Sequence, residues 1–277
     1  MNRFMASGKD PLMVNAQMKA IWSYRGFIWG SVQREFQSRY RNSLLGSVWA
    51  VLTPLATILI YTLIFSRLMQ VRLPGMNDTL AYSIYLCAGI LTWGLFAEII
   101  GRCQTVFLEN ANMIKKLTFP RICLPVIVVL NASVNFLIIF GLFLCFLVLV
   151  GRFPGWVILA LPPILIVQIA LAIGLGIVLG IMNVFFRDVG QFVGIVLQFW
   201  FWFTPIVYPA SVLPEYVQPW FRLNPMVSVV AAYQSILLYG QWPQWSTLIP
   251  ALITAIVVCL LAVGLYRRRA GEMVDEI

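Results

Sequence analysis

Long apolar runs, separated by shorter polar segments, dominate the hydrophobic pattern of the chain. A helix that spans a bilayer needs roughly 20 apolar residues. Six runs are predicted as transmembrane helices, and their approximate bounds are 44–66, 80–101, 122–150, 156–185, 191–208 and 246–266. The pattern therefore predicts an all-α integral membrane protein with one transmembrane domain over residues 42–266.

The segment 21–41, which precedes the first predicted span, has a different pattern. Its apolar residues, among them Ile28 and Val32, can share one face of a helix, while Arg34 and Arg39 occupy other positions. This arrangement is typical of a basic amphipathic helix that lies in the headgroup plane. A solvated lead-in to the first span is the alternative. Residues 1–20 are predicted to be a polar tail without an assigned role.

The segment 209–245 is rich in proline and lies between the fifth and the last predicted spans. Asn224 and Pro225 match the start of a helix, with an N-cap residue followed by proline at the first helical position. A helix over 225–239 would be about 22 Å long, which is shorter than the hydrocarbon core of about 30 Å. The pattern therefore predicts a re-entrant gate hairpin on the periplasmic side.

The distribution of basic residues supports this topology. With six spans and both termini in the cytoplasm, only four of the 19 lysines and arginines fall outside, namely Arg67, Arg72, Arg152 and Arg222. Such a bias follows the positive-inside rule. If 225–239 crossed the membrane, Arg267–Arg269 in the predicted cytoplasmic tail 267–277 would lie outside, so the hairpin is favoured.

Composition excludes several classes of function. The chain is 61% hydrophobic and 10% charged, which leaves too few charges to cover a soluble fold. It contains no histidine and no Cys-x-x-Cys pair, and Gly8-Lys9 does not belong to a nucleotide-binding motif. We therefore expect no catalytic, metal or ATP site in this chain. The net charge of +9 is assigned to membrane orientation, and nucleic acid is not expected as a partner.

Two patterns within the predicted spans are candidates for function. An acid inside a span, here Glu98, is a functional hypothesis by default, although a snorkelling or satisfied glutamate is the alternative. Aromatic residues could line a lumen and stack on sugar rings, or they could form an interfacial belt with ordinary packing. The predicted channel aromatics are Trp49, Tyr61, Trp200, Phe201, Phe203 and Tyr208. In the fourth span, small residues at four-residue spacing, such as Gly176 and Gly180, predict close helix contact, more within the chain than across a dimer.

Five short segments in order resemble the permeases of polysaccharide-exporting ABC transporters, which export O-antigen, capsule or teichoic acid. They are Arg39-Tyr40-Arg41-Asn42-Ser43-Leu44-Leu45-Gly46 with Trp49, Asn112-Met113-Ile114-Lys115-Lys116 with Phe119-Pro120-Arg121, Phe186-Arg187-Asp188, Trp202-Phe203-Thr204-Pro205-Ile206, and Leu223-Asn224-Pro225-Met226. The resemblance implies a homodimer of six-helix subunits above two separate ATPase subunits, which would bind ATP and Mg²⁺. It also implies that the hairpin around Asn224 and Pro225 gates the outer mouth.

The resemblance further implies that the interfacial helix over 21–41 and the loop around 110–117, within the polar segment 102–121, contact the ATPases. The residues expected to couple to them are Asn110, Asn112, Met113, Ile114, Lys115 and Lys116. A solvated connector is the alternative for this loop. Because arginine suits phosphate geometry, Arg34, Arg39 and Arg41 are expected to meet the lipid phosphate at the inner-membrane interface.

Export of a lipid-linked polysaccharide, powered by a partner ATPase, is the leading functional hypothesis. The first alternative is an exporter of drugs or small lipids with the same architecture. The second is an ion-coupled carrier or channel without an ATPase, and only Glu98 supports it.

Overall fold

The computed structural model describes residues 22–40, 48–64, 79–116, 119–212, 214, 216–269 and 271–276. Within these residues the fold is helical, without a β-strand. The elements are α2 (Arg25–Tyr40), α3 (Trp49–Thr62), α4 (Thr79–Cys103), α5 (Val106–Glu109), α6 (Ala111–Lys116), α7 (Cys123–Leu149), η3 (Gly155–Ala160), α8 (Leu161–Phe185), α9 (Val189–Trp202), η4 (Ala210–Val212), α10 (Gln218–Arg222), α11 (Pro225–Tyr239), α12 (Trp245–Arg269) and α13 (Glu272–Glu276).

Four segments of the described chain are long and apolar enough to cross a membrane: Leu80–Cys103, Cys123–Leu149, Gly155–Phe185 and Trp245–Arg269. They correspond to the second, third, fourth and sixth predicted spans. The all-helical membrane class is thus confirmed. The count of six spans is not established, because α3 and α9 contain 14 residues each. Residues at both ends of the first predicted span, 44–66, lie outside the described residues.

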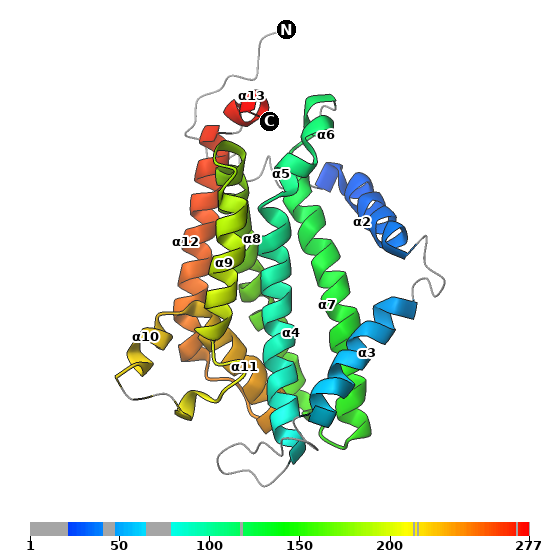
Figure 1. The fold of residues 1–277 in the computed structure, drawn as a ribbon, viewed down its shortest axis with the longest axis vertical. Helices are drawn as coiled ribbons and strands as arrows, with labels where there is room; N and C mark the ends of the chain where they lie inside the picture. The colour runs from blue at the N-terminus through cyan, green and yellow to red at the C-terminus, as the bar shows by residue number, and fades with distance from the viewer. Residues whose placement is uncertain are drawn as a thin grey trace.

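The long helices form a bundle around α8 and α4 (Figure 1). Helix α8 contacts α12 on one side and α4 on the other, while α7 packs against α4, α3 and α2. The short helices α5, α6 and α13 gather at one end of the bundle, and α10 and α11 lie towards the opposite end. Below, we call these the α13 end and the α11 end.

Two glycines allow α8 to approach α4 closely. A Cβ added at Gly180 would lie 2.5 Å from the carbonyl oxygen of Cys103, and one at Gly176 would lie 2.5 Å from the Cβ of the same cysteine. Helices within a bilayer gain little from excluding lipid, so their association depends on such close van der Waals fit. The predicted small-residue contact therefore lies within the chain.

The end of α9 is set by local chemistry. Helix α9 stops at Trp202, six residues before the predicted boundary at Tyr208. Pro205 follows closely, and the residue before a proline avoids the helical region. The chain then makes a turn over 203–208 before the short elements η4 and α10.

Helix α11 has the predicted bounds, Pro225–Tyr239. Asn224 is its N-cap, and the side chain accepts a hydrogen bond from the backbone N–H of Met226 at 3.0 Å. Gly240 ends the helix in the left-handed region, with φ of 60°, where glycine has no Cβ penalty.

Candidate functional site

A groove runs along the exposed face of α9 and ends at the start of α11. Its volume is about 530 Å³. The residues that line this α9 groove are Phe192, Ile195, Val196, Phe199, Trp200, Phe203, Asn224 and Pro225. Phe199 and Phe203 are 64% and 60% exposed. Large apolar side chains left uncovered in this way mark a surface that meets lipid, another chain or a ligand.

Asn224 joins the end of α9 to the start of α11 through four hydrogen bonds. Its Oδ1 accepts from the indole Nε1 of Trp200 at 2.8 Å, as well as from Met226. Its Nδ2 donates to the carbonyl oxygen of Phe203 at 3.0 Å and to Thr204 Oγ1 at 3.1 Å. The Asn224 side-chain amide thereby uses both of its donors and both acceptor positions of its oxygen, at the end of the α9 groove where α11 begins.

The turn over 203–208 is also held from α4 and α11. The Tyr85 hydroxyl donates to the carbonyl oxygens of Pro205 and Tyr208, both at 2.9 Å. Gln234 of α11 donates to the Pro205 oxygen at 3.3 Å, and the Tyr82 hydroxyl donates to the oxygen of Val207. Backbone carbonyls of the turn that lack helical partners are thus satisfied by side chains of α4 and α11.

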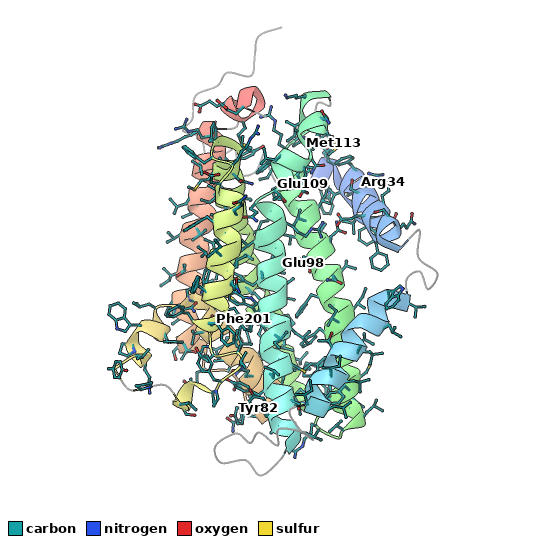
Figure 2. All side chains as sticks on the ribbon, in the orientation of Figure 1. Arg34, Tyr82, Glu98, Glu109, Met113 and Phe201 are labelled. Atoms are coloured by element: carbon teal, nitrogen blue, oxygen red, sulfur yellow. The ribbon has the colours of Figure 1, made fainter. Side chains whose placement is uncertain are left out.

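The predicted channel aromatics divide into two groups. Trp200 and Phe201 pack inside the chain against Trp93. Their ring centroids lie 6.2 and 5.9 Å from that of Trp93, and both rings are half-buried. Phe203 is exposed, as is Trp49 on α3. Figure 2 places Phe201 between α9 and α4.

The two remaining predicted channel aromatics are Tyr208 and Tyr61. The hydroxyl of Tyr208 donates to the carbonyl oxygen of Trp202, and its ring is half-buried. The side chain of Tyr61 lies outside the described residues. The sequence prediction omitted Phe192 and Phe199, although the spacing of 192, 195, 196, 199 and 203 follows one face of a helix and could have identified them.

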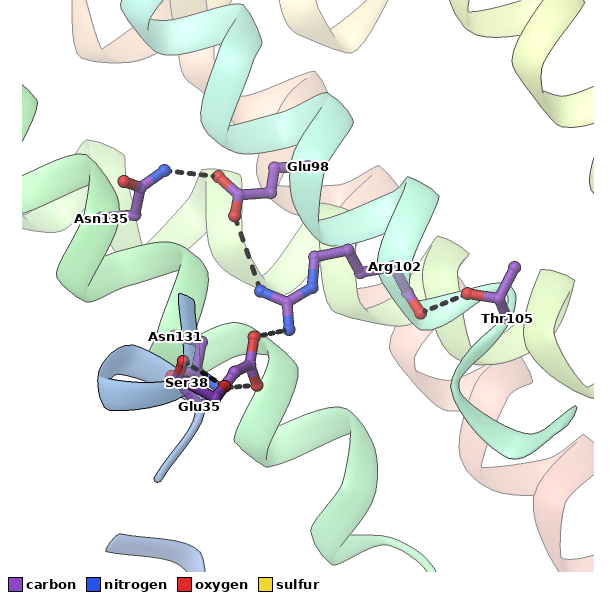
Figure 3. A network of polar contacts seen from close by, with 7 residues as sticks. All are labelled: Glu35, Ser38, Glu98, Arg102, Thr105, Asn131 and Asn135. Atoms are coloured by element: carbon purple, nitrogen blue, oxygen red, sulfur yellow. Dashed lines mark hydrogen bonds and ion pairs between the residues drawn. The ribbon is translucent and has the colours of Figure 1, made fainter. Parts of the chain in front are cut away.

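A second polar cluster ties α2 to α4 and α7 (Figure 3). The Glu35 carboxylate of α2 accepts hydrogen bonds from Arg102 of α4 and from Asn131 of α7. Arg102 also forms an ion pair with Glu98 at 3.6 Å, and Asn135 donates to the other Glu98 oxygen at 3.0 Å. Glu98 was a sequence candidate. Of its two partners, Arg102 lies one turn away on α4, whereas Asn135 comes from α7 and could not be predicted from the sequence.

The apolar face of α2 is partly as predicted. Ile28 and Val32 are buried against Cys123 and Ile127 of α7. Trp22, another apolar residue of the segment 21–41, is 71% exposed.

The arginines expected to meet phosphate are only partly described. Arg34 is exposed and donates to the Ser31 hydroxyl at 2.9 Å. The side chain of Arg39 and the whole of Arg41 lie outside the described residues.

The loop 102–121 forms the short helices α5 and α6 at the α13 end. Ile114 is buried in the core and Met113 packs against it, so both anchor α6. Asn110 donates to the Val106 carbonyl oxygen at 2.8 Å. Asn112 and Lys115 point outward and are exposed, and the side chain of Lys116 lies outside the described residues. The loop thus presents a polar surface on an apolar base.

No group of His, Cys, Asp and Glu residues that could hold a metal ion occurs in the described part of the chain. The described sites offer neutral hydrogen bonding, aromatic surface and one partly buried ion-pair cluster.

These features define a multi-pass helical membrane protein with a partly non-helical segment at one end of the bundle. The chain belongs to the ABC-2 type transporter membrane family, whose model matches residues 27–238.

Curated relatives cover most of the chain. It is 29% identical to the O-antigen export system permease protein RfbA of Myxococcus xanthus over 262 residues, which are 94% of this chain and 98% of that protein. It is 31% identical to an RfbA permease of Klebsiella pneumoniae over 75% of this chain and 78% of that one. The Polysialic acid transport protein KpsM of Escherichia coli is 21% identical over 88% of this chain and 93% of that one.

Proposed function

We propose that this chain is the membrane subunit of an ATP-driven exporter that moves a lipid-linked polysaccharide across the inner membrane. The α9 groove carries the proposal, because it exposes aromatic surface and leads to the hydrogen-bonded segment around Asn224. Relatives named for O-antigen export and polysialic acid transport match the chain over most of its length. Family membership supports a separate ATPase as the energy source.

In this proposal two copies of the chain face each other across the α9 groove. The groove is open on one side of the bundle, and a second copy would close it into a lumen that crosses the membrane. Phe199 and Phe203 would then meet the glycan, since aromatic faces accept the C–H faces of sugar rings. The half-buried Phe201 supports this wall from behind, and Trp200 both lines the groove and packs against Trp93 of α4.

The proposed orientation places the α13 end in the cytoplasm. Arg267–Arg269 close α12 at that end, and a basic helix end favours the cytoplasmic side. Helix α2 would lie in the headgroup plane there, with Arg34 available to lipid phosphate. Arg39 and Arg41 keep the same proposed role.

Contact with the ATPase subunits is assigned to α6. Its buried Ile114 and partly buried Met113 would transmit a push to the core, while Asn112 and Lys115 provide the polar contact. The turn over 203–208, together with η4, α10 and α11, would form the outer gate. In this arrangement the segment is a hairpin that enters the bilayer and leaves it on the same side. At 15 residues α11 spans about 22 Å, which supports this geometry.

The structure gives Glu98 a structural explanation. Its carboxylate contacts Arg102 and Asn135. The described spanning segments therefore contain no unpaired acid that would support the hypothesis of an ion-coupled carrier. Full export by a Glu98→Gln variant would remove its remaining support.

The deciding experiment is deletion of the gene in the native host, followed by complementation. We expect surface polysaccharide to be lost, lipid-linked polysaccharide to accumulate on the cytoplasmic side, and the tagged chain to co-purify with an ATPase at a two-to-two ratio. Unchanged surface polysaccharide in the deletion strain would refute the proposal. Purification of the chain without an ATPase would refute the assigned energy source.

A further inference from the structure

A second cavity lies at the α11 end, between α11 and the segment that leads into α12. Its volume is about 660 Å³, within the range of about 300–1,000 Å³ that small-molecule sites occupy. The residues that line it are Val227, Ser228, Ala231, Ala232, Ser235, Gln241, Trp242, Pro243, Gln244, Thr247 and Pro250. We call it the α11–α12 cavity.

The lining combines an aromatic face with neutral hydrogen-bonding groups. Trp242 is 57% exposed at the cavity. The amides of Gln241 and Gln244 are exposed beside it, and each can donate and accept hydrogen bonds. Small side chains of α11, among them Ser228 and Ala231, leave the space open.

The charge of the cavity selects among ligands. None of the eleven described lining residues is ionisable at neutral pH. A phosphate or a carboxylate is bound in proteins by arginine, lysine or clustered N–H groups, and the lining side chains supply no cation. A neutral pyranose needs an aromatic face for its C–H groups and amides or hydroxyls for its O–H groups, and the cavity supplies both.

The cavity is close to the proposed glycan path. Pro225 lines the α9 groove, and one turn later Ser228 lines the α11–α12 cavity. The Ser228 hydroxyl donates to the Pro225 carbonyl oxygen at 2.9 Å. The first turn of α11 therefore separates the linings of the two depressions.

We propose that the α11–α12 cavity is a binding subsite for a neutral sugar residue of the exported glycan, with Trp242 stacking on the ring and Gln241 and Gln244 bonding its hydroxyls. The inference rests on the proposed function, since it takes the exported polysaccharide as the ligand. It adds a site outside the α9 groove that would hold the glycan after it has passed the gate.

The test places a photoreactive residue at the cavity in the full transporter. A Thr247→p-benzoylphenylalanine variant, which lines the cavity and keeps Trp242, Gln241 and Gln244, is expressed in the exporting host and irradiated. The attached polysaccharide is detected by the mobility of the chain. We expect a crosslink that falls about tenfold when Trp242→Ala is added and is retained with Trp242→Phe. The matched control is p-benzoylphenylalanine at Trp220, which is 73% exposed on α10 and does not line the cavity.

The outcomes separate the subsite from the proposed function. Export by the wild type, without a crosslink at position 247 or with equal crosslinks at both positions, would overturn the subsite alone. A crosslink to phospholipid in place of polysaccharide would also overturn it, by assigning the cavity to a lipid headgroup. Absence of export in the wild-type strain would instead refute the proposed function.

Discussion

The indole Nε1–H of Trp200 donates to Oδ1 of Asn224 across 2.8 Å, and this bond joins the last turn of α9 to the N-cap of α11. The tryptophan is held in turn by Phe96 and Trp93 of α4, with ring centroids 5.2 and 6.2 Å away. One aromatic side chain thus fixes the position at which the backbone leaves α9 and re-enters a helix.

Replacing Asn224 with alanine should destabilise this junction. The change removes the N-cap of α11, a loss of about 1 kcal/mol in typical helices, and leaves the Trp200 N–H without its partner. We expect a lower melting temperature of the purified protein and reduced export. Asn112→Ala, an exposed asparagine on α6, is the control for stability, and an equal melting temperature in both variants would contradict the assigned role.

Exposed and half-buried aromatics of α9 should differ in what their loss affects. Phe199→Ala removes a ring that is 64% exposed in the α9 groove, so we expect reduced export with little change in melting temperature. Trp200→Ala removes packing against α4 and should lower the melting temperature. Phe153→Ala, a ring that is 47% exposed outside the groove, serves as the control. Normal export by Phe199→Ala would speak against a lumen on this face.

A Gly180→Ala variant should fold poorly. The new Cβ would meet the Cys103 carbonyl oxygen at 2.5 Å, a backbone atom that cannot move without shifting α4 against α8. We expect less folded protein in the membrane, measured by fluorescence-detected size exclusion of a tagged chain. Gly141→Ala on α7 has no neighbour within 4 Å of its new Cβ and should be tolerated. Equal yields of the two variants would show that α4 and α8 are not this close.

The Glu35–Arg102 pair should show measurable coupling. A double-mutant cycle with Glu35→Gln and Arg102→Gln isolates the pairwise energy, and melting of the purified protein provides the readout. The two side chains are about a third exposed, and both make further bonds within the cluster. We therefore expect a coupling of about 1 kcal/mol, at the upper end of the range for accessible pairs.

The control for that cycle is the pair Arg269–Glu272, whose side chains are 51% and 54% exposed. Its coupling should be smaller, since water screens it more strongly. A coupling near zero for Glu35–Arg102 would mean that this pair does not help to hold α2 on α4.

Charge reversal on α6 should weaken assembly with the ATPase. Replacing Lys115 and Lys116 with glutamate reverses two charges on α6, of which Lys115 is exposed, while Ile114 remains buried. We expect less ATPase to co-purify and less export, at an unchanged amount of folded chain. Ser246→Glu at the α11 end is the control, and undiminished co-purification by the lysine variant would remove α6 as the contact.

The long apolar elements could be predicted from the sequence because their chemistry is local. A run such as Cys123–Leu149 is recognisable by length and hydropathy alone. The start of α11 was equally local, since Asn224 and Pro225 are neighbours in the chain. Helix α9 was predicted too long, because hydropathy continues past Trp202 while Pro205 and the side-chain hydrogen bonds end the helix there.

The contacts between helices could not be predicted from the sequence, because they join residues that lie far apart in the chain. Glu35, Glu98 and Asn131 come from three helices, and no spacing in the sequence relates them. The direction of each aromatic ring on α9 depends on which face meets α4, so Trp200 and Phe203 could not be separated by composition. Their assignment to a lumen stays a prediction.

Helix α4 forms hydrogen bonds to other segments of the chain near each of its ends. Near one end Tyr82 and Tyr85 hold the turn over 203–208, and near the other Arg102 is bonded to Glu35 of α2. Its 25 residues form a rod about 37 Å long. A tilt of this rod, imposed where α2 and the short helices meet it, would pull directly on the carbonyls of the turn at the far side of the membrane. Helix α4 would thus transmit a displacement of α2 to the turn, through the hydroxyls of Tyr82 and Tyr85.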